Sequence, residues 1–161
     1  MAASRTFALH ESVPLRWWLY HLPLSEGALH FRRTFLETGR AKLLAPETLV
    51  TGLLADVASD CSNFPVPISG DIVDALFDDI LETLRVMEAS RTLSVVSVRP
   101  LLAAAFRISC QSLMTLSDAL VVVLAVSQGI PVLIGDETAR ERIHASSVLG
   151  VVPEVVSVSE L

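Results

Sequence analysis

The hydrophobic and polar positions divide the chain into short apolar runs that alternate with longer segments of helical periodicity. The apolar runs predict strands at residues 6–10, 41–44, 93–98, 130–134 and 154–158. Apolar residues three or four positions apart predict helices over residues 12–20, 25–38, 46–59, 71–89, 100–111, 115–128 and 137–145. This alternation is typical of a mostly parallel sheet covered by helices on both faces. We therefore expect an α/β fold.

Prolines and glycines support several of these boundaries. Pro14 and Pro46 suit the first turn of a helix, and Gly39 and Gly129 suit helix ends. The Ser-, Pro- and Gly-containing stretch at residues 60–70 is interpreted as a loop inside one domain. The helix predicted over residues 71–89 has acidic residues opposite an apolar face, which indicates a solvated face rather than a metal site.

Length and composition favour one domain over residues 1–161 with an additional apolar surface. A hydrophobic share of 52% and a mean hydropathy of +0.56 suggest either a densely covered sheet or a face reserved for a partner, and we expect a homodimer. The net charge of −6 argues against a surface that is basic overall. The longest apolar run, residues 119–126, is far below the roughly 18 residues of a membrane span. With Cys61 and Cys110 interpreted as reduced thiols and no secretory signal recognised, the expected location is the cytoplasm.

Two carboxylates are the candidates for chemistry. Asp118 is at the start of an apolar helix, and Asp136 directly follows an apolar strand and Gly135. Helix starts and strand ends gather along the carboxyl edge of a parallel sheet, where ligands bind. We therefore expect Asp118 and Asp136 to lie close together.

The strings SDAL at residues 117–120 and IPVLIGDE at 130–137 resemble the PIN-domain family of metal-dependent ribonucleases, particularly the toxins of bacterial toxin–antitoxin pairs. Weaker matches at residues 7–19 and 45–47 extend the resemblance over most of the chain. The resemblance implies a three-layer α/β sandwich and an acidic site that holds Mg²⁺ or Mn²⁺. It also implies an RNA substrate and an antitoxin-like protein partner.

The chain departs from this family at three positions of the acidic site. His10 stands where the family has its first Asp, although Ser12 matches the hydroxyl that follows it. Gly52 stands at the place of the family's Glu, and Ile134 replaces a Thr two residues before the last Asp. The family's site has four acids, and only Asp118 and Asp136 of this chain match them. An imidazole at position 10 suits Mn²⁺ or Zn²⁺ better than Mg²⁺.

Two further acids are considered as substitutes. Asp56 follows Gly52 by four residues and shares its helix face, and Glu11 is next to His10. A strand neighbour of His10 is expected to point to the opposite face, and a residue one helical turn along lies about 6 Å farther away. Both are therefore expected to reach the site only after rearrangement.

Each candidate also has a structural interpretation. Asp118 forms a capping-box pattern with Thr115, and Asp136 suits the N-cap of the helix that follows it. His10 suits a buried strand end. Arg140, like Arg142, either contacts a phosphate near the site or pairs with acids of its own helix.

Three functions follow from these observations. The first is a PIN-like protein with lost or impaired nuclease activity and a retained binding role. The second is an active, atypical endoribonuclease that uses Mg²⁺ or Mn²⁺ with Asp118 and Asp136. The third is an unrelated α/β interaction domain whose acids only cap helices.

Overall fold

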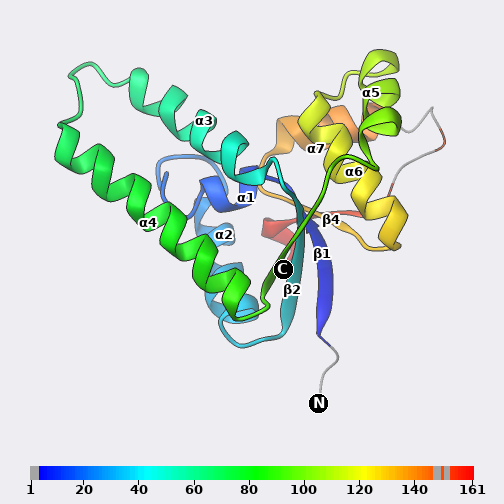
Figure 1. The fold of residues 1–161 in the computed structure, drawn as a ribbon, viewed down its shortest axis with the longest axis horizontal. Coiled ribbons are helices and arrows are strands. Elements are labelled where there is room, and N and C mark those ends of the chain that lie inside the picture. Colours follow the sequence, from blue (N-terminus) through cyan, green and yellow to red (C-terminus); the bar gives the residue numbers. More distant parts are fainter. Residues whose placement is uncertain (1–3, 147–149, 151–152) are drawn as a thin grey trace.

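Five parallel strands form the centre of the protein (Figure 1). The computed structural model describes residues 4–146, 150 and 153–161. The sheet has the order β3-β2-β1-β4-β5. Its strands are β1 (Arg5–Leu9), β2 (Ala41–Pro46), β3 (Leu93–Val96), β4 (Val132–Ile134) and β5 (Val155–Ser157). All five predicted strands are therefore confirmed, and all described pairings are parallel.

Helices cover both faces of this sheet. They are α1 (Ser12–Leu15), α2 (Ser25–Phe31), the π-helix η1 (Arg32–Leu36), α3 (Leu49–Ser62), α4 (Gly70–Ala89), α5 (Leu102–Gln111), α6 (Leu116–Gln128), α7 (Glu137–Ala145) and the 3₁₀-helix η3 (Val158–Glu160). Alternate residues of β1 point to opposite cores, because Phe7 and Leu9 pack with α2, α3 and α4 while Ala8 packs with α6 and α7. The result is the three-layer sandwich that the sequence predicts.

The helix predicted over residues 12–20 is wrong beyond its first turn. α1 ends at Leu15, and turns lead to Leu24, which has a positive φ of 65°. After Leu15 the backbone tightens into turns, since the N–H groups of Arg16, Trp17 and Trp18 donate to the carbonyl groups three residues before them. Trp17 is 1% exposed in this turn, and its Nε1–H donates to the carbonyl of Ala28 at 3.2 Å. Arg16 is buried beside it.

Two other boundaries differ from prediction. Pro46 ends β2 instead of opening a helix, because the N–H of Glu47 still donates to Val96 of β3 at 2.9 Å. The helix predicted over 25–38 changes at Arg32 into the wider π turn, and Phe35 of this turn stacks on Phe31 of α2 with ring centroids 5.6 Å apart.

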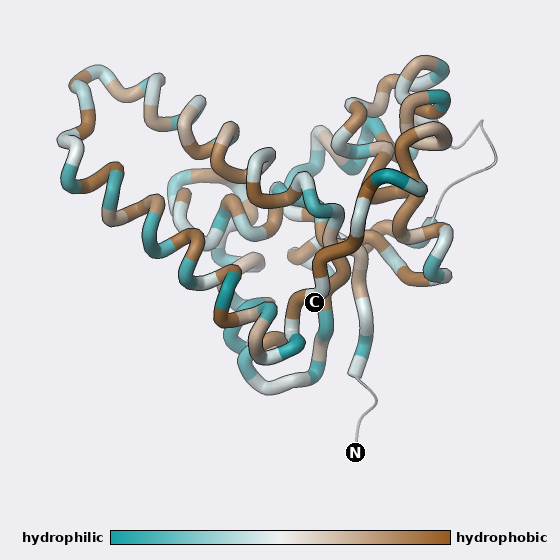
Figure 2. The backbone as a smooth tube through the Cα atoms, in the orientation of Figure 1, coloured by the Kyte–Doolittle hydropathy of each residue, from teal (hydrophilic) through white to brown (hydrophobic). Residues whose placement is uncertain are grey.

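The hairpin of α3 and α4 extends away from the sheet (Figure 1). We call these two helices and their connection, residues 49–89, the arm. Trp18 contacts the middle of α4, because its Nε1–H donates to Asp79 at 2.6 Å. Hydrophilic and hydrophobic residues alternate along α4 (Figure 2). Among the described helices, which include this long one, none meets the length and apolarity needed to cross a membrane.

Candidate functional site

Asp118 lies in the first turn of α6, at the carboxyl edge of the sheet. Its side chain is 1% exposed. The capping box is present, since the N–H of Asp118 donates to Thr115 Oγ1 at 3.1 Å and the N–H of Thr115 donates to Asp118 Oδ2 at 3.0 Å. These two hydrogen bonds at the start of α6 therefore hold the Asp118 side chain in place.

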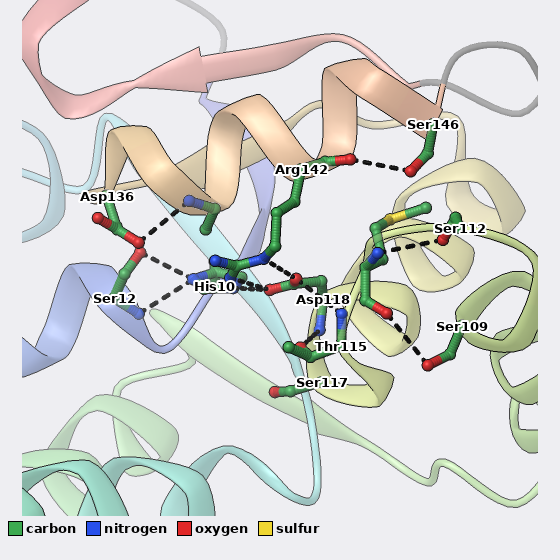
Figure 3. A network of polar contacts seen from close by, with 12 residues as sticks. His10, Ser12, Ser109, Ser112, Thr115, Ser117, Asp118, Asp136, Arg142 and Ser146 are labelled. Atoms are coloured by element: carbon green, nitrogen blue, oxygen red, sulfur yellow. Dashed lines mark hydrogen bonds and ion pairs between the residues drawn. The ribbon is translucent and has the colours of Figure 1, made fainter.

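His10 and Arg142 also contact the carboxylate oxygens of Asp118 (Figure 3). His10 Nε2 lies 3.0 Å from Asp118 Oδ1. Arg142, which reaches across from α7, donates from Nε to Oδ2 at 2.9 Å and from Nη2 to Oδ1 at 3.2 Å. This is the bidentate fork that guanidinium groups form with carboxylates. Each oxygen of Asp118 thus has two partners within the chain.

His10 is tied to the start of α1 through its other ring nitrogen. Nδ1 lies 2.8 Å from Ser12 Oγ, and the N–H of Ser12 points at Nδ1 from 3.1 Å. Ser12 Oγ in turn accepts the N–H of Gly135 at 3.0 Å, across to the end of β4. A Cβ on residue 135 would lie 2.9 Å from the carbonyl oxygen of Ser12, so this close approach requires glycine.

The mutual contacts shift the pKa values of all three groups. Burial alone raises the pKa of Asp118, but its hydrogen bonds to His10 and Arg142 outweigh burial and hold the pKa well below the usual carboxyl range. Burial lowers the pKa of His10, whereas the hydrogen bond to Asp118 and the charges of Glu11 and Asp136 give it a net rise above 6.5. The hydrogen bond to Asp118 also raises the pKa of Arg142. Asp118 is therefore an anion neutralised from within the chain.

Asp136 is the N-cap of α7, as its structural interpretation predicts. Its Oδ2 accepts the N–H of Ala139 at 3.1 Å. Its Oδ1 faces Arg16, whose Nη2 lies 3.8 Å away. Asp118 and Asp136 line one cavity of about 380 Å³, so the expected proximity of the two acids is present.

Glu11 and Asp56 also line this cavity, although the sequence predicts that both acids reach the site only after rearrangement. The expectation for Glu11 is wrong because β1 already ends at Leu9, so strand alternation no longer governs residues 10 and 11. The Glu11 carboxylate accepts a hydrogen bond from Ser117 Oγ at 2.6 Å. It also lies beside Gly52, where an added Cβ would meet Glu11 Cδ at 4.0 Å. Burial, followed by the charge of Glu11, raises the pKa of Asp56.

Arg140 does not line the cavity, in contrast to Arg142. Its Nη2 donates to Glu160 at 2.6 Å, and its Nη1 lies 3.7 Å from Glu137 of the same helix. Arg140 therefore pairs with acids, as the structural interpretation predicts, and one of these acids belongs to its own helix. The cations that face the acids are Arg142 and Arg16, and no pairing of Arg16 with the site is evident from sequence.

The arrangement does not fit the divalent metal that the resemblance implies. Over the described residues, no group of three or more His, Cys, Asp or Glu side chains is arranged to hold a metal ion. Mg²⁺ requires near-octahedral oxygen ligands. Here the most buried carboxylate, Asp118, already has both oxygens bonded to donors of its own chain.

Comparisons with known proteins bear on the fold. No protein-family model and no curated protein matches the sequence. Among solved structures, a chain in the structure of FitAB bound to an IR36 DNA fragment superposes with a TM-score of 0.63 at 14% identity, over 96% of each chain. At this identity the similarity shows the fold alone, which is a PIN-like three-layer sandwich.

Proposed function

We propose that this chain is a PIN-like domain of the toxin–antitoxin type that has lost metal-dependent ribonuclease chemistry and functions by binding. One observation carries the proposal: the Asp118 carboxylate is fully engaged by His10, Arg142 and the backbone of Thr115. The similarity to a FitAB chain supports the toxin–antitoxin type of fold.

Arg142 is the main obstacle to a metal at this site. A guanidinium stays charged at every physiological pH, so it does not release the carboxylate by losing a proton. A hydrated Mg²⁺ would have to break two charge-assisted hydrogen bonds and give up tightly held water. The loss of ligands at His10 and Gly52 removes the coordination that would compensate for this cost.

A protein partner is the ligand that this proposal favours. The FitAB neighbour is a complex bound to DNA, and an antitoxin-like protein is the corresponding partner proposed here. The net charge of −6 disfavours direct contact with RNA or DNA over a large surface. We also propose a homodimer, in which the two copies bury apolar surface against each other.

One observation favours a second candidate, an atypical metal-dependent endoribonuclease. Glu11 and Asp56 line the same cavity as Asp118 and Asp136, which brings four carboxylates to one site. Glu11 also fills the space beside Gly52. This candidate requires Arg142 to leave Asp118 before any metal is held.

Cleavage of a mixed RNA pool distinguishes the two candidates. The purified protein is incubated with Mg²⁺ or Mn²⁺, with a chelator control and with the variants Glu11→Gln and Asp136→Asn. We expect no cleavage above the chelator control, because Asp118 is not free to ligate a metal. Metal-dependent cleavage that both variants abolish would overturn the proposal and establish the second candidate. Cleavage that neither variant changes comes from a contaminating nuclease.

A further inference from the structure

Charge is strongly segregated along this chain. Between Lys42 and Arg85 there is no lysine or arginine, whereas there are eight acidic residues. These are Glu47, Asp56, Asp60, Asp71, Asp74, Asp78, Asp79 and Glu82. Between Glu88 and Asp118 the pattern reverses, because no acid occurs and three arginines do. The first stretch contains most of the arm, and the second contains β3 and α5.

The arm combines this negative charge with an uncovered apolar surface. Val73, Phe77 and Leu81 of α4 are 44%, 45% and 36% exposed and lie four residues apart, which places them in one stripe. Asp74 and Asp78 run alongside. Val73 and Phe77 also line an apolar cavity of about 450 Å³ between α3 and α4. The arm therefore presents an apolar stripe edged by carboxylates.

Helix α5 presents the opposite combination. Of its residues, all of which the structure describes, Ala105 alone is buried. Leu102 and Phe106 are 41% and 64% exposed and form a stripe of their own. Arg107 follows on the adjacent part of the helix surface, and Arg99 precedes the helix; both are exposed. This surface is apolar and edged by guanidinium groups.

We propose that α5 of one copy of this chain docks on α4 of the arm of a second copy. Two arms facing each other would bring many carboxylates together, and the one arginine of residues 49–89, Arg85, is already paired with Glu82 of its own helix, which opposes an arm-to-arm contact. Contact between α5 and α4 buries both apolar stripes and places Arg107 and Arg99 near the acids of α4. A single contact thus accounts for two surfaces that the isolated chain leaves uncovered.

The two surfaces lie on different parts of the molecule. Figure 1 shows the arm on one side of the sheet strands and α5 at the far side. The contact therefore joins unlike patches of two copies and is heterologous, so it is a second contact beside the proposed homodimer and extends association to a ring or a chain of copies. It involves no residue of the His10–Asp118–Arg142 network. It goes beyond the proposed function and stands or falls independently of RNA cleavage.

Sedimentation of the full chain at about 100 µM tests this contact. We expect self-association at about 0.05 M salt that weakens at about 0.5 M salt, because the charged edges are screened. Arg107→Glu and Asp78→Lys are each expected to weaken it about tenfold, and the double variant is expected to restore it. Phe106→Ser is expected to weaken it at both salt concentrations.

Glu26→Lys, an exposed acid of α2 outside both surfaces, is the matched control and is expected to leave association unchanged. All of these substitutions are at exposed positions, and circular dichroism checks that each variant is folded. A wild-type chain that stays monomeric under these conditions overturns the second copy as the occupant of α4. So does a double variant that associates no better than the two single ones.

Discussion

Replacing Asp118 with alanine is expected to lower the free energy of unfolding by about 3 kcal/mol, the usual effect of breaking a buried ion pair by removing one partner. The substitution leaves His10 buried without its carboxylate and removes one half of the capping box with Thr115. Arg142 is partly exposed and regains water, so we assign the larger part of the loss to His10. Thermal unfolding is expected about 9 °C lower.

The pH dependence of this effect has two parts. The pKa of Asp118 is held below its ordinary value, so its contribution to stability is present above the ordinary carboxyl range and is lost as the pH falls through the lowered pKa. Asp118 also raises the pKa of His10, so the difference in stability between wild type and Asp118→Ala should widen as the pH falls through the histidine range and narrow only in stronger acid. Glu26→Ala, at an exposed acid of α2, is the control and is expected to stay within about 0.5 kcal/mol of wild type.

An unchanged or increased stability of Asp118→Ala would contradict this interpretation. Carboxylates kept together for catalysis repel one another, and their removal often stabilises a protein. A lower free energy of unfolding in Asp118→Ala thus indicates an acid that stabilises the fold, whereas an unchanged or higher one indicates an acid retained for catalysis.

The second large effect is expected at Arg16. Its guanidinium, 5% exposed as a residue, donates to the carbonyl oxygens of Ser12 at 2.8 Å and Pro23 at 2.5 Å and faces Asp136. Arg16→Met keeps most of the volume but leaves these two carbonyl groups without their donor. We expect a loss of about 2 kcal/mol in denaturant unfolding and faster amide hydrogen exchange over residues 16–25.

Arg33→Met is the matched control for Arg16, because Arg33 is an exposed arginine of η1. It is expected to change stability by less than about 0.5 kcal/mol. Equal unfolding curves for Arg16→Met and wild type would show that the turns after α1 do not depend on this side chain.

The sheet was predictable from sequence because its strands are short, apolar and separated by helical segments. The error over residues 12–20 has a clear cause: apolar residues at helical spacing also occur where Trp17 enters the core from a turn. Side-chain periodicity does not register a buried arginine that bonds backbone carbonyls, which is the role of Arg16.

The candidate site was predictable only in part. The proximity of Asp118 and Asp136 follows from helix starts and strand ends at one edge of the sheet. The cations that meet them do not follow from sequence, because Arg142 crosses from α7 to α6 and this contact depends on how the two helices pack. Glu11 was misplaced because β1 ends one residue earlier than its apolar pattern indicates.

Calorimetric titration of the wild-type protein with Mn²⁺, beside Asp118→Asn, tests most directly whether Asp118 is held by its own chain instead of by a metal. We expect the wild type to bind no more Mn²⁺ than the variant does, because His10 and Arg142 already bond to the Asp118 carboxylate. Binding of one Mn²⁺ per chain in the wild type, lost in a folded Asp118→Asn variant, would show that His10 and Arg142 do not block the Asp118 carboxylate and would establish Asp118 as a metal ligand.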